Sequence, residues 1–375
     1  MSERSSVHLA HHWLVGMRGG EAVLEQFSLL CPEAPIHTLV ANPAKLSEAL
    51  QRHRIETSFL QRLGGIRRYK EMLPLFPLAV GRMRVPKTAT FVLSSDAAVI
   101  KGLRMPEGVP HVCYCHSPPR YLWDQQETYA KQTSGLGAFG RFVFRAVTPY
   151  VRRFDQNAAR GVDHFIANSG FVAERIRRCY GREAAVIYPP VNVGAFEADR
   201  PRGDFYLIVS ELAPYKRVDL AVEVFTRLGE PLVVIGDGPE MPRLRAMAGP
   251  TVNLMGRQPS AVLKEHYERC AAFLYPQVED FGITAVEAQA AGAPVIALAA
   301  GGALESVLDD ETGVFFPEQK VESLMRAIKH FEERRALLTP SNCRRNAERF
   351  RPERFRVEIL GFLKLHYPSH FGFRE

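Results

Sequence analysis

Short apolar runs alternate with amphipathic helical stretches along this chain, and this alternation restricts its possible folds more than any other feature. In the first half, the strand-like runs lie at 7–14, 36–41, 91–95, 111–116 and 164–169. Helical patterns separate several of them, at 21–30, around 138–160 and near 171–180. Apolar strands joined through helices favour a parallel sheet that is covered on both faces.

A Pro-Pro break within 185–196 interrupts this pattern, which then starts again. The second series has strand-like runs at 205–210, 231–238, 252–256, 271–276 and 294–298, with helical stretches between them. Because 375 residues exceed what one hydrophobic core normally supports, we expect two domains. Their predicted ranges are 1–188 and 189–350, and a helical segment at 351–375 is expected to pack back on the first domain. Residues 344–366 are expected to form a closing basic-aromatic helical segment.

The overall composition is that of an ordinary soluble globular protein, with 46% hydrophobic and 24% charged residues. No apolar run is long enough for a membrane span, and the first twenty residues lack the layout of a signal peptide. The ligand spacing of Cys113, Cys115 and His116 is too close for a metal site and has no distant partner pair. We therefore expect no metal, and interpret both cysteines as strand residues in a reducing cytoplasm.

Charge is distributed unevenly between the two halves. Residues 1–190 carry 25 Lys and Arg against 15 Asp and Glu, a net charge of +10, whereas the remainder carries 23 against 26, a net charge of −3. A basic first half suits an anionic lipid surface or a phosphorylated acceptor. Nucleic acid is not expected, because no binding motif accompanies the charge. The basic-apolar segment 59–87 fits either a lipid interface or a helical pair that covers the first domain.

The segment 278–298 carries the most chemical information. Glu279 precedes a turn at Phe281-Gly282-Ile283, a short apolar helix follows, and Glu287 lies within that helix. The turn places unpaired backbone N–H groups at a helix N-terminus, where a phosphate can bind. The two carboxylates are acceptors suited to sugar or ribose hydroxyl groups. For an isolated acidic pair the ordinary interpretation is a solvated helix surface, but neighbouring motifs favour a ligand site.

Other candidate residues also lie where a strand ends and a helix begins, the edge at which open α/β sheets bind ligands. They are Gly19 and Gly20, His116, Lys216 and Arg217, and Gly236. Alone, these residues fit an ordinary turn, a structural histidine or a solvated basic pair equally well. The loop at 236–240 is not a GxGxxG motif, and no GxxxxGK[ST] motif occurs, so neither NAD nor a phosphate loop of that kind is indicated.

Taken together, these segments resemble the retaining glycosyltransferases of family 4 (glycosyltransferase group 1), over essentially the whole chain. The most specific part is an E-x7-E element, Glu279 to Glu287. Supporting segments are GGEAVLE, CYCHSPPRYLWD, HFIANSGFVAERI, VIYPPVNVGAF, PYKRVDLAVEVF and VVIGDGP. The resemblance implies a GT-B fold, in which two Rossmann-like domains with parallel sheets face a central cleft.

The resemblance also implies roles for individual residues. Lys216 matches the lysine that contacts the donor diphosphate, Glu279 the glutamate that holds the donor sugar, and Glu287 the carboxylate on the ribose. Gly19, Gly20 and His116 match groups of the first domain that face the transferred sugar. The remaining positions implied in donor binding are Arg217, Gly236, Met255, Gly256, Arg257, Phe281, Gly282 and Ile283. In one departure, Glu211 stands where the family commonly has an arginine, so either Arg217 or another basic group substitutes, or Glu211 turns away.

The function implied is transfer of a hexose from a nucleoside diphosphate sugar to a hydroxyl group, with retention of configuration and without a metal or other cofactor. Similarity to bacterial mannosyltransferases of surface-polysaccharide assembly favours GDP-mannose as donor and a glycan, such as one linked to polyprenyl diphosphate, as acceptor. The expected location is the cytoplasm, with peripheral contact to the anionic inner membrane face. Two alternatives stay open: a sugar-nucleotide epimerase of the same architecture, and a non-catalytic binder of sugar nucleotides.

Overall fold

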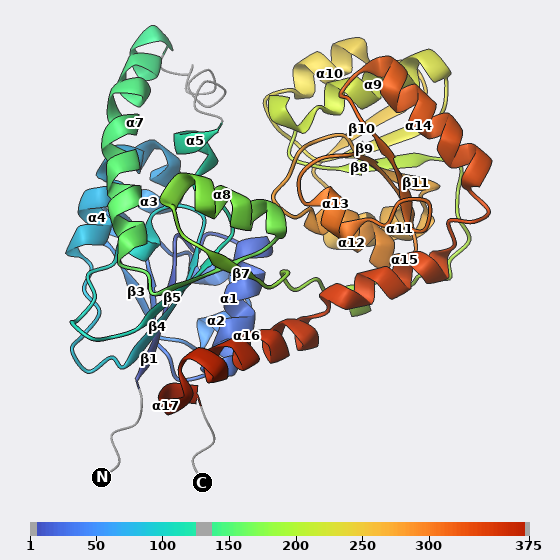
Figure 1. Cartoon of the computed structure of the whole chain (residues 1–375). Coiled ribbons are helices and arrows are strands. Elements are labelled where there is room, and N and C mark those ends of the chain that lie inside the picture. Colours follow the sequence, from blue (N-terminus) through green and yellow to red (C-terminus); the bar gives the residue numbers. More distant parts are fainter. Residues whose placement is uncertain (1–5, 125–136, 372–375) are drawn as a thin grey trace. The chain divides into compact units, whose positions relative to one another are not determined.

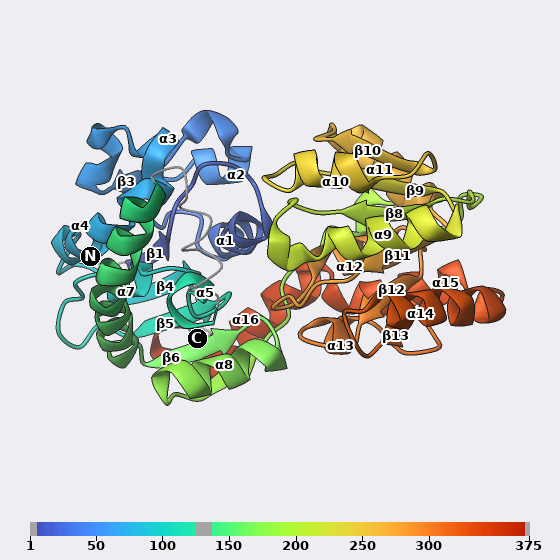
Figure 2. The ribbon, with the colours of Figure 1, turned by 90° about the horizontal axis from the view of Figure 1, so that it is seen from above.

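The computed structural model describes residues 6–124 and 137–371, and the chain divides into two compact units. The first unit comprises Met1–Pro190 and Glu353–Glu375, and the second comprises Val191–Pro352. Each unit is built around one parallel sheet with helices on both faces (Figures 1 and 2). The prediction of an α/β protein with two Rossmann-like domains is thereby confirmed.

The first unit contains a seven-stranded sheet in the order β3-β2-β1-β4-β5-β6-β7, and all its paired strands run parallel. The strands are β1 Val7–His11, β2 Ile36–Thr38, β3 Ile55–Thr57, β4 Phe91–Asp96, β5 His111–Cys115, β6 His164–Ala167 and β7 Ala184–Val186. The α-helices described in this unit are α1 Gly19–Leu30, α2 Glu48–Gln51, α3 Gly65–Arg68, α4 Phe76–Arg82, α5 Arg120–Trp123, α7 Gly137–Arg160, α8 Gly170–Tyr180, α16 Pro352–His366 and α17 Pro368–Phe371.

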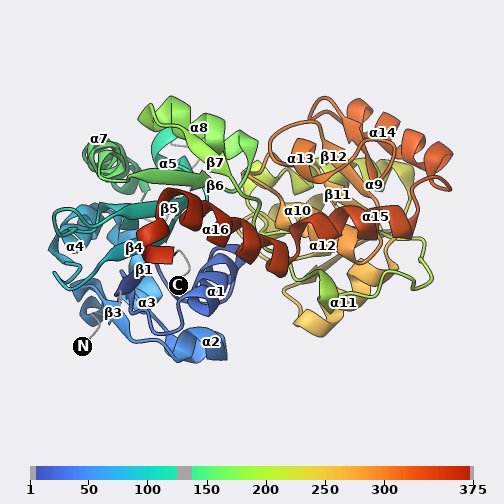
Figure 3. The same cartoon turned by 60° about the horizontal axis from the view of Figure 1, so that its bottom comes forward.

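Two hydrophobic cores cover the faces of this first sheet. On one face, α1 and α16 pack together, with the rings of Phe27 and Phe355 stacked 5.9 Å apart between their centroids; Figure 3 shows the two helices side by side. On the other face, α4 and α7 contribute Phe76, Val80 and Val151 to a second core. The C-terminal helices therefore complete the first unit, although their sequence follows the second.

The second unit contains a six-stranded parallel sheet in the order β10-β9-β8-β11-β12-β13. Its strands are β8 Tyr206–Val209, β9 Leu232–Ile235, β10 Val252–Gly256, β11 Ala272–Tyr275, β12 Val295–Leu298 and β13 Gly313–Phe316. Its α-helices are α9 Val218–Leu228, α10 Met241–Met247, α11 Ser260–Arg269, α12 Ile283–Ala290, α13 Ala303–Ser306, α14 Val321–Arg334 and α15 Pro340–Ala347.

Both sheets reverse their strand order at one point. The first strand of each sheet, β1 or β8, has the second strand of its unit on one side and a later strand, β4 or β11, on the other. The loops that follow these two strands diverge to opposite faces, which opens a crevice at the carboxyl edge of a parallel sheet. The loops after β1, β4, β8 and β11 are therefore the places to look for a site.

The segment 59–87 forms short helices rather than one amphipathic pair. It contains a 3₁₀ turn at Phe59–Leu63, α3, a second 3₁₀ turn at Tyr69–Leu75 and α4. Leu60 and Phe76 are buried in the core, whereas Leu63 and Leu78 are exposed. The segment thus covers the first sheet and also presents an apolar outer face. No helix in the described part of the chain is both long enough and apolar enough to cross a bilayer.

The predicted helical segment at 344–366 is helical except at Arg351, where it is interrupted. The chain forms α15, a 3₁₀ turn at Glu348–Phe350 and then α16, with extended backbone at Arg351. Arg351 precedes Pro352, and a residue before proline is sterically pushed out of the helical region. This break allows α15 to belong to the second unit and α16 to the first.

Candidate functional site

The strongest candidate site of the second unit lies where its strand order reverses, between β8 and β11. The loop after β8 leads through a 3₁₀ turn at Pro214–Lys216, and the loop after β11 leads through Glu279 to α12. Because parallel strands end at the same edge of a sheet, the two loops meet there. The predicted residues Lys216 and Glu279 come together as a result.

Lys216 and Glu279 form an ion pair in which the ammonium donates to Oε1 of the carboxylate. Their side chains are 16% and 19% exposed, so the pair is shielded but still reachable from solvent. An ammonium group is a point charge for a phosphate oxygen, and a carboxylate accepts hydrogen bonds from hydroxyl groups. One position of the fold therefore offers partners for both parts of a sugar phosphate.

Arg217 is the N-cap residue of helix α9 and has a left-handed conformation, with a φ of 52°. Its guanidinium donates from Nε to Asp219 Oδ1 at 3.3 Å and from Nη1 to Gln319 Oε1 at 3.3 Å. Glu211, the departure from the family pattern, is exposed at the start of the same loop. Because the Glu211 carboxylate is hydrated, its charge opposes a bound phosphate only weakly. The loop still supplies two cationic groups, those of Lys216 and Arg217.

The turn before α12 depends on glycine. Gly282 is the N-cap with a φ of 96°, and a Cβ atom at this residue would lie 2.7 Å from the hydroxyl oxygen of Tyr275. Only glycine adopts this conformation readily, and only glycine fits against that hydroxyl. The turn aims the first N–H groups of α12 at the edge that carries Glu279. Phe281 is buried and Ile283 is half-buried, which fixes the turn in place.

A second glycine turn, Gly301-Gly302 after β12, supports the loop that contains Glu279. The N–H group of Gly302 donates to the carbonyl oxygen of Glu279 at 2.9 Å. A Cβ atom at Gly301 would lie 2.5 Å from that same oxygen, and one at Gly302 would lie 2.3 Å from Cα of Phe281. The close approach of the Gly301-Gly302 backbone to the backbone of Glu279 and Phe281 fixes the position of Glu279.

Glu287 lies one turn into α12 and is partly exposed. The hydroxyl group of Tyr267, on α11, donates to Glu287 Oε2 at 3.1 Å. Loss of hydration raises the pKa of Glu287 to about 7, and the Tyr267 hydrogen bond only partly opposes this shift. The carboxyl group is thus poised to change charge near neutral pH when a hydrogen-bonding ligand arrives.

The ends of β9 and β10 bring the other predicted positions together. The N–H group of Gly236 donates to the carbonyl oxygen of Gly256 at 2.9 Å, and a Cβ atom at Gly236 would lie 1.8 Å from the carbonyl oxygen of Ser210. Met255 is held by the amide of Gln258, which donates to its carbonyl oxygen at 2.7 Å. Arg257 follows directly in the chain.

The first unit gathers buried polar groups at its own reversal point, between β1 and β4. Ser95 Oγ lies 2.7 Å from His116 Nε2 and 3.1 Å from His11 Nδ1. Gly20, at the start of α1, lies over these rings: its Cβ atom would be 3.6 Å from Nε2 of both His11 and His116. The predicted residues Gly20 and His116 are therefore neighbours, and Gly19 is the first residue of the same helix.

Sequence reasoning missed Ser95, His11 and Tyr267. Ser95 and His11 end apolar strands, and only the pairing of β1 with β4 places them together, in the register His11 to Ser95. Tyr267 is one of several apolar or aromatic residues on α11, and the sequence pattern does not distinguish a buried partner of Glu287 from an ordinary core residue. No signal in the sequence identifies any of the three.

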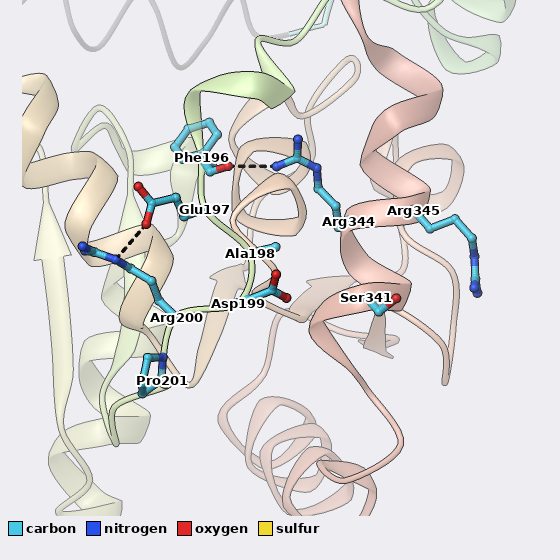
Figure 4. Close-up of a pocket in the computed structure, with 9 residues that line it drawn as sticks. All are labelled: Phe196, Glu197, Ala198, Asp199, Arg200, Pro201, Ser341, Arg344 and Arg345. Atoms are coloured by element: carbon cyan, nitrogen blue, oxygen red, sulfur yellow. Dashed lines mark hydrogen bonds and ion pairs between the residues drawn. The ribbon is translucent and has the colours of Figure 1, made fainter.

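A separate surface depression lies elsewhere on the second unit (Figure 4) and contains none of the predicted residues. Its lining is Phe196, Glu197, Ala198, Asp199, Arg200, Pro201, Ser341, Arg344 and Arg345. Arg344 points inward and donates to the carbonyl oxygens of Phe196 at 2.9 Å and Ala290 at 3.1 Å. Ala290 ends α12, so this arginine satisfies one carbonyl group at the helix end opposite the candidate site.

Comparison with known families matches both halves of the chain. The model of Glycosyltransferase Family 4 matches residues 44–194, and the model of Glycosyl transferases group 1 matches residues 196–350. The chain is built from two glycosyltransferase domains. Among solved structures, HepE from Anabaena in complex with UDP-glucose superposes with a TM-score of 0.69 at 17% identity, over 96% of this chain and 99% of that one. The two-domain fold is therefore of the GT-B type.

Curated relatives match over part of their length. An exopolysaccharide phosphotransferase from Streptomyces coelicolor is 33% identical over 38% of this chain and 17% of its own. A GDP-mannose-dependent alpha-(1-6)-phosphatidylinositol monomannoside mannosyltransferase from Mycobacterium tuberculosis is 27% identical over 50% of this chain and 57% of its own. The match thus spans less than two thirds of either relative.

Proposed function

We propose that this protein is a retaining glycosyltransferase that moves a hexose from a nucleoside diphosphate sugar to a hydroxyl group. The observation that carries the proposal is the meeting of Lys216, Glu279 and the first turn of α12 at one edge of the second sheet. In this proposal Lys216 and the amides of Phe281, Gly282 and Ile283 bind the diphosphate, and Glu279 binds the sugar. Glu287 binds the ribose, and Met255, Gly256 and Arg257 contact the base.

The proposed chemistry is electrostatic. Positioned cationic and N–H groups stabilise the charge that develops on the leaving diphosphate, at little cost in reorganisation. We propose that the acceptor attacks from the face that the diphosphate leaves and that a departing phosphate oxygen takes its proton, because no carboxylate is assigned as a covalent nucleophile. Gly19, Gly20 and His116 are proposed to contact the transferred sugar. We propose further that no cofactor or metal takes part, so that a chelator leaves turnover unchanged.

GDP-mannose is the proposed donor, in bacterial polysaccharide biosynthesis, with a glycan or polyprenyl-diphosphate-linked glycan as acceptor. The Mycobacterium tuberculosis relative supports it, since its name includes GDP-mannose; UDP-glucose, bound in HepE, is the alternative donor. Purified protein should be offered a panel of nucleotide sugars, with release of nucleotide followed with and without acceptor. Acceptor-dependent release supports transfer. Epimer formation without acceptor supports an epimerase, and binding without turnover supports a non-catalytic binder.

Binding of a nucleoside diphosphate sugar, whose phosphates do not titrate near neutral pH, is expected to remove a proton from Glu287. The free carboxyl has a pKa of about 7, and ribose hydroxyl groups that donate to it favour its charged form and lower that pKa. Affinity should therefore increase as pH rises, by roughly tenfold between pH 6 and pH 8. Calorimetry in buffers of different ionisation enthalpy measures the released proton directly. In Glu287→Gln both effects should vanish; a flat pH profile in the wild type would refute this role.

We propose that the first unit contacts an anionic membrane through helix α7, together with the outer face of the segment 59–87. Phe142 and Tyr150 on α7 are 70% and 55% exposed. Arg145 and Arg153 are also exposed on this helix, whose single acidic residue, Asp155, is buried. On α7 this gives an aromatic and cationic surface without exposed carboxylates, which matches the interface of a negatively charged bilayer. In the segment 59–87, the exposed Glu71 pairs with Arg68.

Cosedimentation tests this membrane contact. The chain should bind vesicles that contain phosphatidylglycerol more tightly than vesicles of phosphatidylcholine alone. Since each basic residue near the surface contributes about 1 kcal/mol, the double substitution Arg145→Glu and Arg153→Glu should weaken binding by roughly 30-fold or more. Arg52→Glu, at a residue whose side chain is 79% exposed in the same unit, is the matched control. Equal binding of the double variant and the wild type would exclude this surface.

A further inference from the structure

Ser95 lies between a buried histidine, His11, and a partly buried one, His116, at the carboxyl edge of the first sheet. It is fully buried near the end of β4, and its hydroxyl group is 3.1 Å from His11 Nδ1 and 2.7 Å from His116 Nε2. Strand pairing fixes this arrangement, since His11 on β1 is directly opposite Ser95. The neighbouring strand β5 ends at Cys115, so that His116 follows as the first residue of its loop.

A single hydroxyl proton couples the two rings. Burial lowers the pKa of His116 to about 3 and that of His11 well below its usual value, so both rings are neutral at pH 7. A neutral imidazole has one N–H group and one bare nitrogen. Ser95 donates one hydrogen bond and accepts another, so of the two ring nitrogens that face it one must carry a proton and the other must be bare.

The surroundings of His11 determine the direction of the hydrogen bonds that link His11, Ser95 and His116. His11 Nε2 is buried and has no hydrogen-bond partner in the described part of the protein. A buried N–H group without an acceptor is strongly disfavoured, whereas a bare nitrogen lacks only one partner. His11 therefore carries its proton on Nδ1 and donates to Ser95. The Ser95 hydroxyl in turn donates to His116 Nε2.

We propose that Ser95 is a positioning residue that, with His11, holds His116 in the tautomer whose proton is on Nδ1. His116 then offers an N–H donor, which suits an oxygen of a sugar hydroxyl or a phosphate. Gly20 contributes by leaving space, because a Cβ atom there would lie 3.2 Å from His11 Cε1. The catalytic consequence rests on the proposed function, in which His116 contacts the transferred sugar; the tautomer itself does not.

The tautomer can be measured on the full chain labelled with ¹⁵N-histidine. Long-range ¹H–¹⁵N correlation spectra distinguish an Nδ1–H ring from an Nε2–H ring, and the variant His116→Gln identifies the signals of His116. The wild type should show His116 with its proton on Nδ1. In Ser95→Ala, where nothing donates to Nε2, the Nε2–H form should appear. Ser95→Thr keeps the hydroxyl group and should restore the wild-type pattern.

Ser94 provides a matched control. It is the adjacent residue of β4, is equally buried, and its hydroxyl group lies 2.7 Å from Nε2 of the buried His111. Ser94→Ala therefore loses a similar hydrogen bond but should leave the His116 tautomer unchanged. With an active donor and acceptor, Ser95→Ala should lower kcat by about tenfold at constant donor affinity, as the loss of a supporting hydrogen bond commonly does. Ser94→Ala should not lower kcat.

The outcomes separate this inference from the proposed function. An Nδ1–H form of His116 that is lost in Ser95→Ala but kept in Ser94→Ala supports the inference, even if no transferase activity is found. A wild-type His116 with its proton on Nε2, or an unchanged tautomer in Ser95→Ala, overturns it, even if the protein transfers sugar. An unchanged kcat in Ser95→Ala would overturn the positioning role.

Discussion

Replacing Glu279 by glutamine is expected to lower kcat by roughly 10²–10³-fold, the range found when one preorganised polar group is removed from an active site. Glutamine retains the shape of the side chain but removes the charge that pairs with Lys216 and accepts sugar hydroxyl groups. Gly302 holds the backbone of residue 279 through a hydrogen bond that the substitution leaves intact, so the fold should persist. Steady-state kinetics with the active donor measures the change.

The control for this substitution is Glu223→Gln. Glu223 lies on α9 of the same unit, its side chain is 40% exposed, and it also pairs with a basic residue, Arg227. It undergoes the same chemical change within a helix, outside the loops that follow β8 and β11. Turnover by Glu223→Gln should match the wild type. If Glu279→Gln turned over at the same rate as this control, Glu279 would have no part in transfer.

Gly236→Ala should destabilise the second unit by about 3–5 kcal/mol. Two costs combine: the φ of 147° is unfavourable for any residue with a Cβ atom, and that atom would lie 1.8 Å from the carbonyl oxygen of Ser210. The loop after β8 would have to move to relieve the contact. Gly256→Ala is the matched control, because its φ of 70° imposes strain of about 1 kcal/mol while its Cβ atom would meet nothing within 4 Å.

Urea denaturation can locate this loss in the chain. Both tryptophans, Trp13 and Trp123, belong to the first unit, so their fluorescence reports on that unit, whereas far-UV circular dichroism reports on both. Gly236→Ala should shift the transition seen by circular dichroism and leave the fluorescence transition in place. Equal midpoints for Gly236→Ala and Gly256→Ala would show that the close approach to Ser210 does not limit stability.

The sequence was sufficient to predict most of the fold because buried parallel strands and amphipathic helices have distinct patterns. It failed where neighbours far apart in the chain decide the outcome. The edge strand β3 has three residues, too few for a recognisable period, and pairs only with β2. The break at Arg351 follows from the proline beside it. The expected domain ranges divided the chain after residue 350, whereas the helical pattern expected at 344–366 ran across that point.

In the candidate site, too, some residues could be predicted from the sequence and others could not. Lys216, Glu279 and Glu287 were predictable because they follow strands that end at one sheet edge, and the glycine turns near them mark close backbone approaches. Ser95 was not predictable, because alternation along β4 places Ser94 and Ser95 on opposite faces without indicating which one meets His116. That choice depends on the registers of β4 with β1 and β5.

Calorimetric titration of the full chain with nucleoside diphosphate sugars tests the central claim most directly, namely that Lys216 and the first turn of α12 bind a diphosphate. The wild type should bind one donor molecule per chain. Lys216→Ala should lose about 1.5–3 kcal/mol, the strength of a hydrogen bond to a charged group, while Lys320→Ala, at an exposed lysine of the same unit, should bind normally. Equal donor affinity in the wild type and Lys216→Ala would contradict the account.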